Sequence, residues 1–289
     1  MATIVLHDLT SAHVRHYIQQ PAHALLIVGP TGIGKQFLAQ HLAKELIKGD
    51  VGTYAYIKFI EPEKDKSSIG IEAIRELQHF LKLKLPTNAP WRIIVIPQAQ
   101  GLTTEAQNAL LKSLEEPPER TLFILASNSE QALLPTIRSR SQQLTVHIPT
   151  QQTLLDQFKD DGHEAKELQQ AYMMSGGLPG LMSSLLSDQD HPLKGAVATA
   201  RKLLQSTQFE RLTLVDGLSK DKPAALNVIF VLQHMARAAT TASAKVSDGS
   251  AHQRIKQWHK IHRAAYQAEQ SYAVSGQAKL TLTNMMLSL

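Results

Sequence analysis

Hydrophobic and polar positions alternate between strand-like and helix-like patterns over the first half of the chain. Short apolar or alternating runs predict strands at residues 24–28, 56–60, 92–96, 121–126 and 144–148. Between them, apolar residues recur at helical spacing and predict helices at residues 35–47, 71–81 and 106–114. Five strands joined by crossover helices predict an α/β module whose sheet is mainly parallel and covered on both faces.

One helix of this module has recognisable signals at both ends. Thr104–Gln107 fits a capping box, in which the Thr104 hydroxyl caps the helix and the Gln107 side chain reaches back. Pro117 and Pro118 end the helix, because proline cannot continue it. The helix is therefore expected to start close to Thr104 and to stop before Pro117.

The strand pattern disappears after Pro149. Three short helices are expected in residues 150–187, with breaks at residues 160–162 and 175–180. A second boundary is expected near residues 188–192, and a helical pattern follows to the end, with a loop at Ser243–Ser250. The pattern thus predicts three parts: an α/β module over 1–149, a small helical part over 150–189, and an all-α domain over 190–289.

A glycine-rich segment between the first strand and its helix suggests phosphate binding. Residues 29–36 (GPTGIGKQ) satisfy the G-x-x-x-x-G-K pattern, whose glycines let backbone N–H groups turn toward a phosphate at a helix N-terminus. Lys35 would reach the outer phosphates of a nucleotide. The next position should carry the hydroxyl that binds Mg²⁺, but it is Gln36, whose neutral amide suits that octahedral shell poorly. The candidate nucleotide-binding residues are Gly29, Gly32, Gly34, Lys35 and Gln36.

The acidic residues expected after a neighbouring strand are missing. In phosphoryl-transfer ATPases such residues hold Mg²⁺ and orient the attacking water. The strand at residues 92–96 continues instead as Pro97-Gln98. Gln98 can hydrogen-bond a water but cannot accept its proton, and Pro97 can do neither. The residues therefore favour a chain that does not hydrolyse ATP at its own loop.

Composition excludes several classes of protein. The 289 residues include no cysteine, which excludes a disulfide scaffold, a cysteine-ligated zinc module and thiol chemistry. The longest apolar runs are strand-sized and the first eight residues do not resemble a signal peptide, so no membrane span and a cytoplasmic location are expected. The 13 histidines show no metal-ligand spacing, so no metal site is expected.

The net charge of +5 is unevenly distributed. Residues 1–189 carry 17 Lys/Arg against 19 Asp/Glu, whereas residues 190–289 carry 13 against 6. The basic charge belongs to the C-terminal helical part, which could meet an acidic partner or could simply present a solvated face. The net charge of the α/β module gives no reason to expect that this module binds DNA.

Several segments resemble the clamp-loader branch of the AAA+ ATPases. They are residues 108–118 (NALLKSLEEPP), 123–128 (FILASN) and 134–141 (LPTIRSRS), together with the glycine-rich loop, two stretches within residues 61–75, and residues 176–180 (GGLPG). The resemblance is closest to the delta-prime subunits of bacterial DNA polymerase III and covers residues 20–182. It implies an AAA+ P-loop module, a helical lid over 150–189 and a helical collar domain over 190–289 that mediates oligomerisation.

The resemblance also implies roles for individual residues. Asn128 falls at the sensor-1 position, where the family's polar side chain faces the nucleotide. Arg140, in Ser139-Arg140-Ser141, falls where the family's Ser-Arg-Cys motif supplies an arginine finger to the ATP site of the next subunit. The sensor-2 arginine should fall at Gly180 and is absent, and Gly49–Thr53 replaces the family's zinc module with a short segment that lacks cysteine.

The function that the resemblance implies is that of a non-hydrolysing clamp-loader subunit. Such a chain acts with gamma/tau and delta subunits to load the sliding clamp on primer–template DNA during replication, and it belongs to the DNA polymerase III holoenzyme without polymerase activity of its own. ATP or ADP is the implied ligand of the degenerate P-loop, whereas the residues argue against zinc and Mg²⁺. Two alternatives stay open: an active gamma/tau-like ATPase, and a non-replicative AAA+ nucleotide-binding protein.

Overall fold

The computed structural model describes residues 4–47, 56–63, 68–87, 89–159, 162–186, 193–244, 251–274 and 277–289. The chain forms two compact units, Met1–Pro149 and Thr150–Leu289. Four of the sequence-based expectations lie wholly or mostly outside the described residues: the short segment at Gly49–Thr53, the break at residues 160–162, the boundary at residues 188–192, and the loop at residues 243–250.

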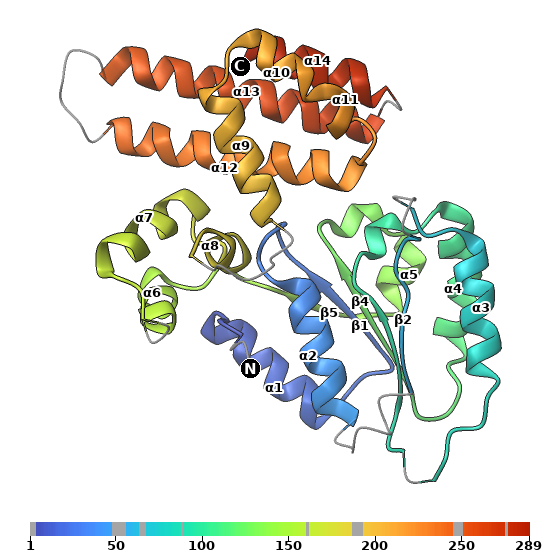
Figure 1. Ribbon diagram of the computed structural model, residues 1–289. Coiled ribbons are helices and arrows are strands. Elements are labelled where there is room, and N and C mark those ends of the chain that lie inside the picture. The colour runs from blue at the N-terminus through green and yellow to red at the C-terminus, as the bar shows by residue number, and fades with distance from the viewer. Residues whose placement is uncertain are drawn as a thin grey trace. The chain divides into compact units, whose positions relative to one another are not determined.

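A five-stranded parallel sheet forms the centre of the N-terminal unit (Figure 1). Its spatial order is β2-β3-β4-β1-β5, and every pairing between these strands is parallel. The strands are β1 (Ala24–Val28), β2 (Ile57–Phe59), β3 (Arg92–Ile96), β4 (Thr121–Ser127) and β5 (Gln142–Thr145). β1, β3 and β4 are buried along their whole length, as expected for inner strands covered on both faces. The predicted α/β class is confirmed.

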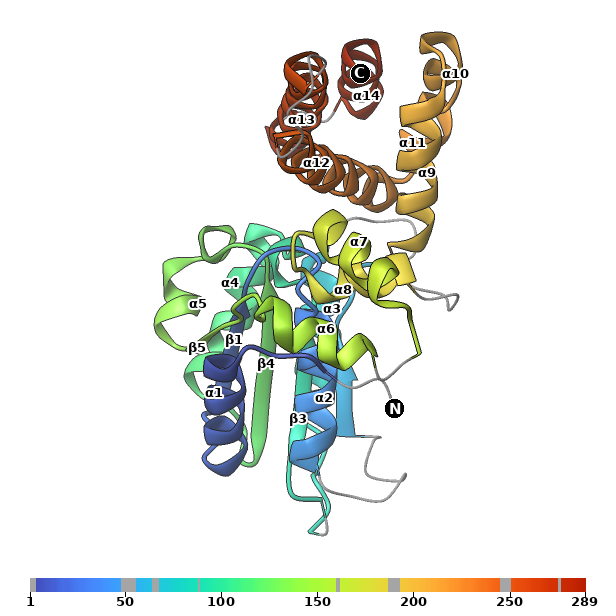
Figure 2. The same ribbon diagram turned by 90° about the vertical axis from the view of Figure 1, so that its left-hand side faces the viewer.

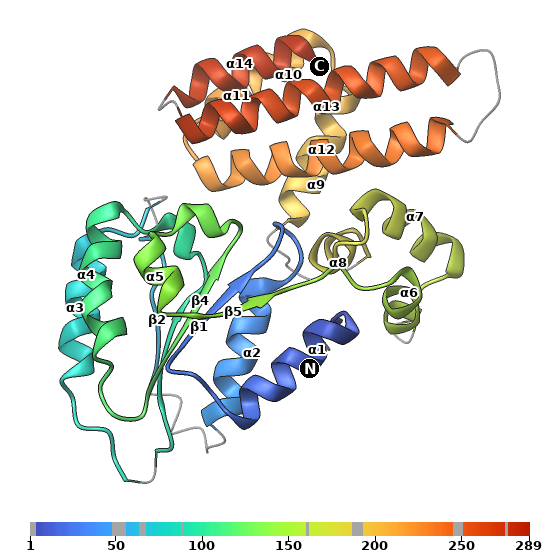
Figure 3. The same ribbon diagram turned by 180° about the vertical axis from the view of Figure 1, so that it is seen from behind.

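Helices cover both faces of this sheet (Figures 1 and 3). α1 (Asp8–Gln19) contacts β5, and α2 (Lys35–Ile47) contacts β1, β3 and β4 on one face. On the other face lie α3 (Ile71–Leu81), α4 (Thr104–Glu115) and the short α5 (Pro135–Ser139), with a 3-10 turn, η2 (Ala99–Gly101), before α4. Alternate strand residues join these helices in one apolar cluster that includes Leu26, Ile94, Phe123, Leu110 and Ile137.

The structure differs from the sequence prediction most clearly at helix α1, which was not predicted, and at the last strand. Helix α1 has no strong apolar periodicity, because its buried face includes Thr10, whose Oγ1 accepts a hydrogen bond from the backbone N–H of His147 at 3.1 Å. The last strand starts at Gln142 and ends at Thr145, instead of spanning residues 144–148. As an edge strand with exposed glutamines it pairs with β1 through its backbone, so its apolar content is a poor guide to its limits.

The predicted capping box on α4 is wrong by one residue. Thr103 is the N-cap, and its hydroxyl accepts from the N–H of Ala106 at 3.2 Å. The Gln107 side chain does not reach back to Thr104 but bonds to other parts of the fold. The predicted end of the helix before Pro117 is confirmed.

The C-terminal unit is entirely helical in its described residues (Figures 1 and 2). Its helices are α6 (Gln151–Lys159), α7 (Ala165–Ser175), α8 (Pro179–Leu186), α9 (Lys194–Gln205), α10 (Gln208–Thr213), α11 (Val215–Leu218), α12 (Lys222–Ala244), α13 (Ala251–Val274) and α14 (Ala278–Ser288). The long helices α12 and α13 lie side by side, α14 packs on α13, and α9 and α7 pack on α12.

Two local features of this unit bear on the predictions. Ser243 is a buried residue of α12, which runs to Ala244, so the first two residues of the predicted loop are helical. Gly176 ends α7 with φ +62°, and a Cβ added there would lie 3.3 Å from Nδ1 of His234 on α12. The division of the unit into a part over 150–189 and a part over 190–289 stays a prediction.

Candidate functional site

The carboxyl ends of the inner strands bring the predicted nucleotide-binding segments together. Val28, the last residue of β1, pairs with Ser127, the last residue of β4, and the N–H of Gly29 donates to the Ser127 carbonyl at 3.4 Å. Gly29 and Asn128 therefore start from neighbouring strands at the same edge of the sheet. Open α/β sheets bind their ligands at this edge.

The glycine-rich loop has the backbone conformation that its sequence predicts. Gly32 and Gly34 have φ values of +79° and +94°, which side-chain-bearing residues rarely adopt. α2 begins directly afterwards at Lys35, so its first N–H groups face the end of the loop. The arrangement is a P-loop: a strand, a glycine-rich turn and a helix N-terminus that can receive a phosphate.

Lys35 lies inside its own loop. Its side-chain Nζ donates to the Pro30 carbonyl at 2.8 Å, and the residue is only 7% exposed. Burial lowers the pKa of Lys35 to about 8, because the charged ammonium has lost most of its hydration. A phosphate in this loop would compete with the Pro30 carbonyl for the ammonium. The ammonium of Lys35 thus lies within the loop, and its charge is weakened by its own surroundings.

The residues around the loop do not fit a Mg²⁺ ion. Gln36 is exposed and offers only a neutral amide. After β3, Pro97 is buried and Gln98 is exposed, so that strand end supplies no carboxylate. Within the part of the chain that the structure describes, no group of three or more His, Cys, Asp or Glu residues could hold a metal ion.

The side chain of Asn128, after β4, is exposed, as a side chain that faces a ligand must be.

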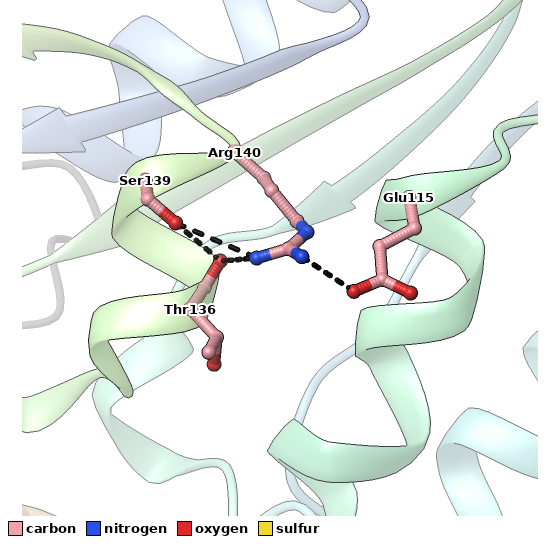
Figure 4. Close-up of polar contacts among 4 residues, drawn as sticks. All are labelled: Glu115, Thr136, Ser139 and Arg140. Atoms are coloured by element: carbon pink, nitrogen blue, oxygen red, sulfur yellow. Dashed lines mark hydrogen bonds and ion pairs between the residues drawn. The ribbon is translucent and has the colours of Figure 1, made fainter.

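Arg140 lies at the C-terminal end of α5 and makes its polar contacts with α4 and α5 (Figure 4). One terminal nitrogen, Nη1, donates to the Thr136 carbonyl at 3.1 Å and to Ser139 Oγ at 3.5 Å. The other, Nη2, forms an ion pair with Glu115 Oε1 at 2.7 Å. The Arg140 side chain is 36% exposed, so these contacts do not enclose it completely.

The register of the sheet separates Arg140 from the P-loop of the same chain. Gln142, at the start of β5, pairs with Leu25, and Thr145 pairs with Val28. Leu25 and Val28 are about 10 Å apart along β1, given ~3.3 Å per residue. Arg140 precedes Gln142 and the P-loop follows Val28, so Arg140 lies toward the amino ends of the strands and the P-loop at their carboxyl ends.

Sequence reasoning did not predict which residues hold α5, since it gave Gln107 only a capping role on α4 and gave Glu115 none. Gln107 is 6% exposed, and its amide donates to the carbonyls of Leu102 and Ala132 and accepts from the N–H of Leu134, the N-cap of α5. The sequence did offer a signal for Gln107, because this residue lies in the apolar stripe of α4. A buried amide requires hydrogen-bond partners, so its position there indicates contacts with other segments. Glu115 has no such signal, since it is one of two adjacent glutamates at the end of a helix.

The fold and the loop together define a P-loop α/β protein. A solved DNA polymerase III gamma subunit-related protein from Thermotoga maritima has a similar fold, with a TM-score of 0.51 at 21% identity over 96% of this chain and 97% of that one. No described helix is long and apolar enough to cross a membrane.

Comparison with known sequences narrows this class. A family model described as "DNA polymerase III, delta subunit" matches residues 9–150. The DNA polymerase III subunit delta' of Pseudomonas aeruginosa is 33% identical over 181 residues (55% of this chain, 54% of that protein), and that of Escherichia coli K12 is 30% identical over 181 residues (56% and 54%). The gamma/tau subunit of Mycobacterium tuberculosis is 34% identical over 135 residues (41% and 23%). The matched region spans about half the length of the delta' relatives. The chain is a clamp-loader-like AAA+ protein.

Proposed function

We propose that this chain is a non-hydrolysing clamp-loader subunit that donates Arg140 to the ATP site of a neighbouring subunit. It acts in the cytoplasm with gamma/tau and delta subunits, and the complex loads a sliding clamp on primed DNA during replication. The similarity to delta' subunits supports the assembly. The observation that carries the proposal is a partly exposed arginine, Arg140, in a chain whose own P-loop lacks the groups for hydrolysis.

The chemistry of phosphoryl transfer explains this division of labour. Hydrolysis needs a positioned metal ion and an oriented water, whereas Gln36, Pro97 and Gln98 supply neither a hydroxyl nor a carboxylate. An arginine finger needs only an accessible guanidinium, which stabilises the charge on the transferring phosphoryl group. Because Arg140 and the P-loop lie toward opposite ends of the strands, the finger serves a site on another chain.

The P-loop keeps a structural role in this proposal. ATP or ADP binds at Gly29, Gly32, Gly34, Lys35 and Gln36 without Mg²⁺-dependent turnover, and Asn128 faces the nucleotide from the end of β4. Residues 150–189 form the lid, and residues 190–289 form the collar through which the subunits associate.

The decisive experiment replaces Arg140 with alanine in a loader reconstituted with gamma/tau and delta. The ATPase rate at the affected site should fall about 10³-fold or more, within the range known for arginine fingers. Arg75→Ala is the matched control, because Arg75 is another exposed arginine of the same unit that pairs with a glutamate, Glu72. Wild-type turnover and clamp loading by the Arg140 variant would refute the proposal.

Two further measurements address the alternatives. Mg²⁺-dependent ATP hydrolysis by the isolated chain, abolished by Lys35→Ala, would identify an active gamma/tau-like ATPase. Failure of the chain to co-purify with gamma/tau and delta in mild salt would favour a non-replicative nucleotide-binding protein.

A further inference from the structure

The guanidinium of Arg140 is held from two helices (Figure 4). Thr136 and Ser139 belong to α5, the helix that carries Arg140, so their contacts fix the guanidinium only relative to that helix. Glu115 is the last residue of α4 and approaches from the other side. Its carboxylate makes the shortest of the three contacts, at 2.7 Å, and it fixes the guanidinium relative to the rest of the unit.

The Glu115–Arg140 pair is poorly suited to stabilise the fold. The two side chains are 47% and 36% exposed, and ion pairs at such positions contribute little to folding free energy. A contact of this kind costs side-chain freedom, because arginine has several rotatable bonds that must be ordered. Ordering the arginine side chain is useful if its guanidinium must act in a fixed place. Functional groups need to be held within about 0.5 Å of their working position.

The contacts also leave the guanidinium able to act. Arginine has five N–H donors, and the three contacts of Arg140 engage Nη1 and one N–H of Nη2. The Nε–H and the second Nη2–H remain for the oxygens of a phosphate. Glu115 can therefore stay paired while the finger works.

We propose that Glu115 is a positioning residue for Arg140. It holds the guanidinium in its working orientation before a neighbouring subunit arrives, so assembly does not have to order the finger. This inference rests on the proposed function, because it assigns Glu115 a role only through Arg140.

The test measures ATPase kinetics of the reconstituted loader at saturating chain concentration. Glu115→Ala should lower kcat by about 10- to 100-fold with little change in the KM for ATP, as expected for a misplaced catalytic group. Glu115→Gln keeps an acceptor but loses the charge, so its kcat should fall less, by about threefold. Glu116→Gln, the adjacent exposed glutamate, is the matched control and should behave like wild type.

A double variant shows whether Glu115 acts through Arg140. In an Arg140→Ala background, Glu115→Ala should cause no further loss. A further loss there, or wild-type or faster turnover by Glu115→Ala alone, would overturn the positioning role while leaving the finger intact. If Arg140→Ala itself has no effect, the proposed function fails and this inference fails with it. If Glu115→Ala does not assemble, Glu115→Gln decides: reduced kcat supports the role, and wild-type kcat refutes it.

Discussion

The buried ammonium of Lys35 should make the stability of the N-terminal unit depend on pH in an unusual direction. The pKa of Lys35 falls from 10.5 to about 8 on folding, because the side chain is desolvated. Between these two values the unfolded chain binds the proton and the folded chain has released it. Stability therefore rises as the pH rises from 8 to 10.5, is fully gained above 10.5, and is lost again as the pH falls through 8.

The size of the effect follows from the shift in pKa. One pKa unit corresponds to about 1.4 kcal/mol, so the full difference is about 3 kcal/mol, of which about 2.5 kcal/mol is present at pH 10. Lys35→Met keeps a similar length and removes the titration. The free energy of unfolding of the wild type, minus that of the variant, should rise by about 2.5 kcal/mol between pH 7 and pH 10.

Denaturant unfolding can measure this difference in the full chain. Trp91 lies in the N-terminal unit and Trp258 in the other, so Trp91 fluorescence in a Trp258→Phe background reports the relevant transition. Other groups that titrate at high pH, such as Tyr17, whose pKa is raised by burial, are common to both proteins and cancel in the subtraction. A difference that is constant with pH, or that falls toward pH 10, would refute the reasoning.

Three further substitutions should destabilise the fold by identifiable mechanisms. Gln107→Ala removes a buried amide and leaves the carbonyls of Leu102 and Ala132 and the N–H of Leu134 without this partner, which should cost about 3 kcal/mol in denaturant unfolding. Arg92→Met removes a buried guanidinium that donates to two carbonyls at the end of α3, at a cost of about 2–4 kcal/mol. Gly176→Ala forces a positive φ, at about 1–2 kcal/mol, and also crowds His234, so it should lower the melting temperature more than Gly162→Ala, where φ is +89° but the space is open.

Each of these predictions has a result that would contradict it. Gln107→Ala and Arg92→Met should destabilise far more than Glu116→Gln, an exposed residue, and an equal effect would mean that the buried hydrogen bonds contribute nothing. Equal melting temperatures for the two glycine variants would mean that His234 on α12 can move away from the added Cβ without loss of stability.

The sequence predicted best those elements whose limits depend on burial. β3 was predicted to the residue, because an apolar run covered on both faces changes to turn residues at each end. α1 was missed, since hydrogen bonds at Thr10 and Tyr17 replace part of the apolar contact that a periodicity search detects.

The candidate site was predictable only where it is a local motif. The conformation of Gly32 and Gly34 follows from adjacent residues. The contacts of Gln107 and the pairing of Glu115 with Arg140 join segments that meet only after α4 and α5 pack together, and no local pattern specifies that meeting.

The parallel register of β1 and β5 also has a consequence for symmetry. In the proposed assembly, an arginine finger at one end of the strands and a nucleotide loop at the other would give each subunit a donor face and an acceptor face, so contacts between subunits would run head to tail. Identical subunits with both faces intact could continue such a series indefinitely. A chain with a working donor face and an acceptor face that cannot hydrolyse completes one active interface only, and in the proposed assembly it therefore occupies a terminal position.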